Sequence, residues 1–272
     1  MLVCTLGDLT LDVVVRLRAP VATGGDTNAS ISIGAGGQAA NVAAWAAALG
    51  AEARFVGRTG ADDAGELVRS KLAAWGVEIV GPVDGRNGTI CSLVAADGER
   101  SMASDRGTAT ELRADELENW WFACDHLHVS GYALMVEPVR SAALRAVELG
   151  REHGARVSID LASWSGIRDS GVDAFRAAMH AAAPDVVFAN DDEVREVGPS
   201  LVDAVWIVKH GANGCSFGGE EREAIPVPAV TDSTGAGDAL AAGWIVGGPD
   251  LALDAAARCV RQVGAMPITS RE

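Results

Sequence analysis

The sequence predicts an α/β fold in which a doubly wound, largely parallel sheet carries helices on both faces and a small β-sheet stands apart. First, short β-branched runs alternate with alanine-rich helical stretches through most of the 272 residues, as in right-handed βαβ units. Second, several strand-like runs, such as Val186–Ala189, are apolar throughout, which is typical of strands covered by helices on both faces. Third, the early part of the chain has strand-like runs with no crossover helix between them.

The alternating segments are expected to build the main sheet and its helices. The expected strands cover residues 1–7, 53–57, 126–131, 155–160, 185–190 and 205–211. The expected helices cover residues 38–49, 62–75, 137–152, 172–182 and 191–198. The helix at 38–49 has the clearest limits, because Gly36-Gly37 precede it and Gly50 follows it.

The runs without crossover helices are expected to form the small sheet. They are Asp12–Leu17, Thr27–Ile33, Thr89–Ala95 and Arg100–Ser104, with a typical two-residue turn at Asp97-Gly98 between the last two. The chain has no long linker, internal repeat or low-complexity tract. Residues 1–272 are therefore expected to form a single domain, with the small sheet built from about 12–33 and 88–105.

Composition argues against several partners. The 22 basic and 37 acidic residues give a formal charge of −15, which disfavours binding to a nucleic acid backbone. The five cysteines are scattered without metal-ligand spacing and are expected to be thiols in a reducing compartment. No basic-then-apolar leader and no apolar run of about 18 residues is present, so no membrane partner is expected and the predicted location is cytoplasmic.

A glycine-rich stretch from Asp232 to Asp238 (DSTGAGD) precedes an alanine-rich segment. Glycines allow a tight turn and a close approach by a ligand. If a helix begins near Gly237, its first N–H groups lack internal partners and favour an anion, such as a phosphoryl group in transfer. Asp238 would then lie beside that anion, positioned to accept a proton from an attacking hydroxyl. An ordinary helix N-cap explains the stretch equally well.

A second glycine-rich stretch, Gly34 to Asn41 (GAGGQAAN), also leads into a helix. Close packing of a helix on a strand is one explanation for its small residues. Asn41 supports a binding role instead, because asparagine is a poor helix former but a good hydrogen-bond partner for hydroxyl groups. Asp12 interrupts two apolar runs after the first strand, where it would either bind hydroxyl groups or mark a turn.

Polar residues also follow two strands at what would be the ligand-binding edge of the sheet. Asn190 and Glu193 share a helix face, so both could approach a metal–phosphate cluster. Taken alone they favour helix capping, with Asn190 as N-cap and Glu193 as its reciprocal partner. Lys209, Gly211 and Gly214 follow the next strand, and either a nearby nucleotide or a simple turn explains them.

Together these motifs resemble the ribokinase-like (PfkB) family of carbohydrate kinases over nearly the whole chain. One family pattern is Gly36 to Ala43 (GGQAANVA), with Gly50 and Gly60 at the expected spacing, and the other is Asp232 to Asp238. Asp12 precedes both patterns, and Asn190 and Glu193 lie between them, in the order that the family shows. In that family a small sheet beside the doubly wound sheet serves as a lid.

The resemblance implies a role for each motif residue. Asp238 would be the general base, and the backbone N–H groups of Gly235, Ala236 and Gly237 would form an anion hole. The sugar would be bound by Asp12, Gly36, Gly37 and Asn41. ATP and Mg²⁺ would lie near Asn190, Glu193, Lys209, Gly211, Gly214 and Thr234, with Glu193 organising Mg²⁺ through water. The K⁺ site found in part of the family would involve Asp232.

Three departures from the family pattern bear on specificity. Gln38 stands where ribokinases commonly have lysine, so the resemblance does not make ribose the substrate. Trp244 stands where an aliphatic residue is usual. The segment from Glu193 to Val205 is short for the family and the chain ends soon after Ala265, so we expect a shallow purine pocket and loose nucleotide selectivity.

The sequence therefore predicts an ATP-dependent kinase that transfers the γ-phosphoryl group to the primary alcohol of a sugar or sugar-like substrate. The lid would close over the sugar and exclude water, and its exposed strand edges would allow a homodimer. Arg106, just after the lid hairpin, could reach the substrate, but a place on the surface is favoured. A nucleoside kinase and a non-catalytic sugar- or nucleotide-binding protein are the alternatives. A Rossmann oxidoreductase is disfavoured, because no GxGxxG follows the first strand.

Overall fold

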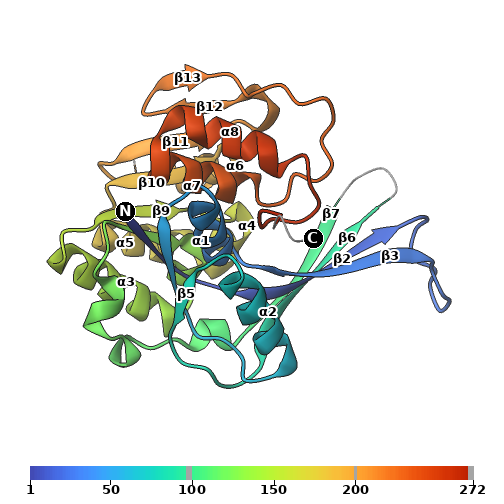
Figure 1. Ribbon diagram of the computed structural model, residues 1–272, viewed down its shortest axis with the longest axis horizontal. Coiled ribbons are helices and arrows are strands. Elements are labelled where there is room, and N and C mark those ends of the chain that lie inside the picture. The colour runs from blue at the N-terminus through green and yellow to red at the C-terminus, as the bar shows by residue number, and fades with distance from the viewer. Residues whose placement is uncertain (96–99, 199–200, 269–272) are drawn as a thin grey trace.

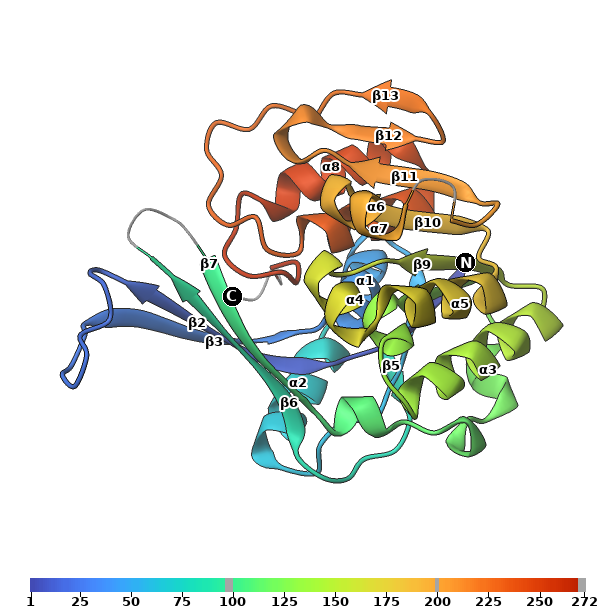
Figure 2. The same cartoon turned by 180° about the vertical axis from the view of Figure 1, so that it is seen from behind.

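The computed structural model describes residues 1–95, 100–198 and 201–268, and it has the predicted α/β architecture. A nine-stranded sheet forms the body, and a four-stranded sheet projects from one side of it (Figures 1 and 2). In spatial order the large sheet contains β13 (Glu220–Arg222), β12 (Cys215–Phe217), β11 (Val205–Lys209), β10 (Val186–Asn190), β9 (Arg156–Asp160), β8 (His126–Ser130), β1 (Leu2–Leu6), β4 (Glu52–Val56) and β5 (Glu78–Val80). Neighbours from β5 to β11 are parallel, and β12 and β13 add an antiparallel edge.

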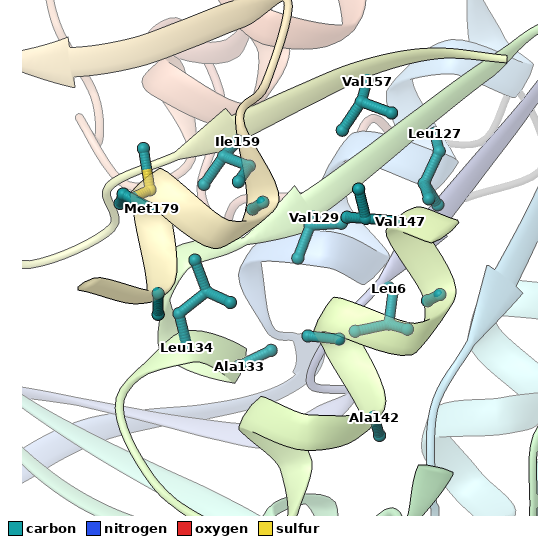
Figure 3. Close-up of a cluster of buried hydrophobic side chains, with 14 of the residues drawn as sticks. Leu6, Leu127, Val129, Ala133, Leu134, Ala142, Val147, Val157, Ile159 and Met179 are labelled. Atoms are coloured by element: carbon teal, nitrogen blue, oxygen red, sulfur yellow. The ribbon is translucent and has the colours of Figure 1, made fainter. Parts of the chain in front are cut away.

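Helices cover both faces of the large sheet (Figure 1). On one face α1 (Gln38–Ala48), α7 (Ala236–Gly247) and α8 (Pro249–Cys259) enclose buried strand residues that include Phe55, Phe188 and Ile207. α2 (Asp63–Ala73) adds Val68 and Leu72 to the same cluster. On the other face, α3 (Val139–Glu152), α4 (Trp164–Ser170), α5 (Val172–Ala182) and α6 (Asp191–Val197) enclose the cluster of Figure 3. No helix in the described ranges is both long and apolar enough to cross a membrane.

Alternation along the strands explains how one sheet serves two cores. In β1, Leu6 faces the cluster of Figure 3, whereas Val3 faces α1 and α7. Successive side chains of a strand point to opposite faces, so a strand with helices on both sides must be apolar throughout. The apolar runs that predicted parallel strands are thus confirmed at β9, β10 and β11.

The small sheet has the spatial order β3, β2, β6, β7. Its strands are β2 (Thr10–Leu17), β3 (Ala29–Gly36), β6 (Asn87–Val94) and β7 (Arg100–Gly107). β2 pairs antiparallel with β3, as β6 does with β7, and β2 and β6 are parallel. β3 begins and ends later than predicted, because Thr10 and Leu11 of β2 still pair with its last residues. The predicted turn at Asp97-Gly98 lies outside the described residues.

Two helices were missed by the sequence reasoning although their boundaries carry ordinary signals. α4 is short and begins after Ser163, whose hydroxyl accepts a hydrogen bond from the Gly166 N–H. α8 begins with Pro249 directly after Gly248, which ends α7. Proline is favoured in the first turn of a helix and glycine just after one, so both signals were present in the sequence.

Candidate active site

The first turns of α1 and α7 meet through a pair of polar side chains. Nδ2 of Asn41 donates a hydrogen bond of 2.7 Å to Oδ2 of Asp238, although 197 residues separate them in the chain. Asn41 is 5% exposed, and its Oδ1 has no hydrogen-bond partner within the described ranges. A buried oxygen without a partner next to a carboxylate is available to a ligand hydroxyl group.

Gly36 and Gly37 bring two aspartates against the start of α1. A Cβ at Gly36 would lie 2.1 Å from Oδ2 of Asp12. A Cβ at Gly37, whose φ is 98°, would lie 2.3 Å from the carbonyl oxygen of Asp8. Both glycines are therefore required by close approach. Asp12, Gly36, Gly37 and Asn41, which the sequence assigned to one site, are indeed brought together.

Asp238 is a partly buried carboxyl group whose pKa is far from the ordinary value. Burial is the main cause that raises its pKa to about 7, and the Asp160 and Asp12 carboxylates add to the rise. The Asn41 hydrogen bond and the Lys209 ammonium act in the opposite direction. A carboxyl group that titrates near neutrality can accept a proton and release it again at physiological pH.

The side chain of Lys209 points from the end of β11 toward α7. Its ammonium donates a hydrogen bond of 2.6 Å to Oδ2 of Asp160, a residue that is 1% exposed. A Cβ at Gly237 would lie 3.2 Å from Nζ of Lys209, so the ammonium sits directly against the first turn of α7. Gly211, which the resemblance grouped with Lys209, lies in the exposed turn after β11. Gly214, also in that group, packs against the carbonyl oxygen of Arg222.

Asn190 and Glu193 form the predicted capping box at the start of α6. Asn190 Oδ1 accepts a hydrogen bond of 2.9 Å from the Glu193 N–H, and Glu193 Oε2 accepts one of 2.8 Å from the Asn190 N–H. Glu193 is 2% exposed, and this burial raises its pKa to about 7 against the lowering effect of Lys209. Because Asn190 is the strand partner of Lys209, the capping box borders the same group of charges.

The DSTGAGD stretch forms a loop that leads into α7. The helix begins at Ala236, and its N-cap, Gly235 at φ 78°, has no side chain to cap the first turn; the Ala236 N–H donates a long hydrogen bond of 3.4 Å to the Ser233 carbonyl. A Cβ at Gly235 would lie 2.5 Å from Cβ of Ala265, so the loop packs tightly on the C-terminal segment. The uncapped N–H groups of such a helix end favour an anion.

Asp232 shapes this loop from its beginning. Its Oδ1 accepts hydrogen bonds of 2.9 and 2.6 Å from the N–H and the hydroxyl of Thr234. Its Oδ2 accepts one of 3.2 Å from the Gly264 N–H. Asp232 and Thr234 also line a cavity of about 270 Å³, together with Asp12 and residues 263–268. The small sheet and the C-terminal end of α2 also line the cavity, and of the residues assigned to the sugar only Asp12 does so.

Arg106 was expected on the surface, and this prediction was wrong. It makes a bidentate ion pair with Asp8, in which Nε lies 2.6 Å from Oδ2 and Nη2 lies 2.8 Å from Oδ1. Its guanidinium carbon also lies 5.5 Å from the centre of the Tyr132 ring. Asp8 is 5% exposed, and a carboxylate so deeply buried requires a counter-charge. The ion pair joins β7 of the small sheet to the segment that follows β1.

Asp8, Tyr132 and Asp160 were missed by the sequence reasoning. Asp160 ends β9 and so carries the same strand-end signal that identified Asn190. Asp8 and Tyr132 have no comparable signal, because their place beside Arg106 depends on how the two sheets are joined.

Comparisons with known proteins identify the family of the chain. The family described as pfkB family carbohydrate kinase matches residues 2–272. An ATP-dependent ribose-1-phosphate kinase from Halopiger xanaduensis is 34% identical over 260 residues, covering 89% of this chain and 83% of that protein. A fructokinase from Escherichia coli is 30% identical over 270 residues, covering 87% and 86%. The solved structure of adenosine kinase from Sinorhizobium meliloti has a TM-score of 0.86 at 25% identity, covering 98% and 96%.

The family match and these relatives define the class of the protein as an ATP-dependent carbohydrate kinase, and the doubly wound fold agrees with it. More narrowly, the chain belongs to the pfkB family of carbohydrate kinases, and the match spans all of the elements described above.

Replacing Asp238 with asparagine should stabilise the protein at high pH. Because the pKa of Asp238 is raised from 3.8 to about 7, the folded protein binds more protons than the unfolded chain between these values. The free energy of unfolding therefore falls as the pH rises through that range. At pH 8 we expect Asp238→Asn to raise the Tm by at least about 2 °C, with a smaller gain at pH 5.

Scanning calorimetry at both pH values checks this expectation. Asp63→Asn is the matched control, because Asp63 lies exposed in the first turn of α2 and should change the Tm little. A lower Tm for Asp238→Asn than for the wild type at pH 8 would contradict the expectation that a charged Asp238 destabilises the folded protein.

Proposed function

We propose that this kinase transfers the γ-phosphoryl group of ATP to the primary hydroxyl of a sugar or sugar-like substrate, with Asp238 as general base. The observation that carries the proposal is the Asp238 carboxyl group, with its raised pKa, in the uncapped first turn of α7. There it would take the proton of the attacking hydroxyl. The N–H groups of Gly235, Ala236 and Gly237 would compensate the charge of the transferred group.

The sugar would lie between Asp238 and the Gly36-Gly37 pair. Asn41 would both orient Asp238 through Nδ2 and receive a substrate hydroxyl at Oδ1, which is buried without a partner in the described ranges. Asp12 would accept hydroxyl groups from the side of the small sheet. The two glycines support this position, because any side chain there would fill the space next to Asp12 and Asp8.

ATP and Mg²⁺ would lie over the ends of β10 and β11. Glu193 is buried and already accepts hydrogen bonds from Asn190, so it fits Mg²⁺ only through water, which Mg²⁺ commonly retains. Bound Mg²⁺ would neutralise charge on the phosphates. Lys209 would add positive charge from beneath α7. The proposed nucleotide site would be lined by Gly211, Gly214 and Thr234.

A sugar or sugar phosphate is the preferred acceptor, and a nucleoside is the second candidate. The curated relatives described above are named as acting on ribose-1-phosphate and fructose. The structural likeness to adenosine kinase keeps adenosine in consideration. The Asn41–Asp238 pair argues against a non-catalytic binding protein, which has no need for a carboxyl group poised near pH 7.

The proposal is tested by measuring ATP turnover with Mg²⁺ and ribose-1-phosphate, ribose, fructose or adenosine. We expect turnover with at least one sugar or sugar phosphate, and phosphorus NMR should identify the product as a primary phosphate ester. Phosphorylation of adenosine alone would establish the nucleoside alternative. If ATP is not consumed with any of these acceptors, the result would favour the non-catalytic binding protein.

With the acceptor found by that panel, Asp238→Asn should lower kcat by on the order of 10²-fold or more while ATP still binds. In the wild type, kcat/KM should fall as the pH drops below about 7, because protonation of Asp238 removes the base. Asp63→Asn serves again as the control and should retain both turnover and pH profile. Near-wild-type turnover in Asp238→Asn would exclude Asp238 as the base.

We further propose that the small sheet is a lid and that two copies of the chain dimerise through it. Ile31 and Ile33 on the edge strand β3 are 62% and 56% exposed. Their strand partners Val15 and Val13 extend the same apolar face into β2. A face of this kind on an edge strand favours pairing with another copy of the chain.

Light scattering tests the dimer. The wild type should have twice the 27.9 kDa mass of one chain, and Ile31→Asp should have the mass of one chain. Val21→Asp is the control, because Val21 is 61% exposed but lies between β2 and β3 rather than in either strand. A wild-type mass of one chain at micromolar concentration would contradict the dimer.

A further inference from the structure

Arg16 links the small sheet to the loop that begins at Asp232. Its Nη2 lies 3.5 Å from Oδ2 of Asp232, and the two side chains are 37% and 11% exposed. Arg16 belongs to β2, whereas Asp232 stands at the head of the loop that leads into α7. The positive charge of Arg16 on the small sheet thus lies beside the start of the loop that would form the anion hole.

The carboxylate of Asp232 is surrounded by hydrogen-bond donors. Oδ1 accepts from the N–H and the hydroxyl of Thr234, and Oδ2 accepts from the Gly264 N–H. Burial works to raise the pKa of Asp232, but these bonds and the charge of Arg16 lower it below the ordinary value. Asp232 is therefore an anion whose charge the protein itself already compensates.

Backbone oxygens around Asp232 also accept hydrogen bonds from the protein, each through one of the two lone pairs of a carbonyl. The Ala265 carbonyl accepts a hydrogen bond of 2.8 Å from the Trp45 indole N–H, and the Thr234 carbonyl accepts one of 3.4 Å from the Cys259 thiol. The Val260 carbonyl accepts one of 2.8 Å from the Thr231 N–H. A monovalent cation needs several oxygen ligands that face it, as other hard cations do.

With Arg16 in place, the loop does not fit the K⁺ that the family resemblance implies for it. K⁺ next to Asp232 would lie close to the Arg16 guanidinium, which already pairs with this carboxylate. Like charges in a partly buried site repel, whereas the existing Arg16 contact is attractive. Arg16 already supplies the charge that K⁺ would bring.

We propose that Arg16 is a positioning residue that takes the place of a monovalent cation, so that phosphoryl transfer by this enzyme does not require K⁺. The inference rests on the proposed kinase function. Arg16 holds Asp232, Asp232 holds Thr234, and Thr234 immediately precedes Gly235 and the first turn of α7. Because Arg16 belongs to the small sheet, it contacts Asp232 only when that sheet is in its observed position.

The test compares ATP turnover in potassium chloride and in N-methyl-D-glucamine chloride at equal ionic strength, with Mg²⁺ and the acceptor found by the substrate panel. The wild type should show the same kcat in both salts. Arg16→Met should lose on the order of tenfold in kcat without K⁺ and recover when K⁺ is added. Arg16→Lys, which keeps a positive charge, should need K⁺ less than Arg16→Met does.

Arg18→Met is the matched control, since Arg18 is an exposed arginine just past the end of β2. It should behave as the wild type does in both salts. A second readout needs no turnover: K⁺ should raise the Tm of Arg16→Met, but not of the wild type, relative to N-methyl-D-glucamine.

Saturable activation of the wild type by K⁺ would overturn the inference. Full kcat of Arg16→Met without K⁺ would also overturn it. The same holds if K⁺ does not restore the kcat of Arg16→Met and Arg16→Lys has an equally low kcat. A chain that phosphorylates no acceptor in any salt would instead refute the proposed kinase function. In that case a K⁺-induced rise in the Tm of the wild type would still overturn the cation inference separately.

Discussion

The candidate site depends on the electrostatic interaction of the Lys209 ammonium with the buried carboxylates around it. Burial acts to lower its pKa, but the carboxylates of Asp160, Glu193 and Asp238 raise it, so Lys209 remains charged. Several carboxylates this close together, in a protein of net charge −15, would otherwise hold protons and lose their ability to accept one. Lys209 compensates them only partly, since Asp238 and Glu193 still titrate at about pH 7. Asp238 thereby keeps a raised pKa, whereas a carboxylate fully paired with a cation would have a low pKa and would accept a proton poorly.

Glycine at a few positions lets the polar residues converge around that charge. Gly36 and Gly37 admit Asp12 and the Asp8 backbone, and Gly235 admits Ala265. These approaches bring the first turns of α1 and α7 together, where Asn41 meets Asp238. Two ion pairs then join the small sheet to the body, Arg106 with Asp8 and Arg16 with Asp232. Hydrogen bonds, close contacts and ion pairs therefore connect Asp238, the start of α7 and the small sheet.

The sequence was sufficient for the parts of the structure that local patterns determine. Apolar runs identified the parallel strands, the two glycine stretches marked the starts of α1 and α7, and the capping of α6 by Asn190 and Glu193 followed from their spacing. Partners across the two sheets could not be read in this way. Arg106 looked like a surface residue, and the direction of the Lys209 side chain was missed, because each depends on a carboxylate supplied by a distant segment.

The contact of Ala265 with Gly235 has a consequence for how the protein is made. The Trp45 indole of α1 donates its hydrogen bond to the Ala265 carbonyl, so segments 220 residues apart together support the loop before α7. On the ribosome, a nascent chain emerges with Asp12 and Asn41 more than 200 residues before Ala265. The glycine pair at α1 is then present long before the segment that supports the loop exists. A growing chain can fold much of its large sheet early, but it acquires a complete site only after Ala265 has been synthesised.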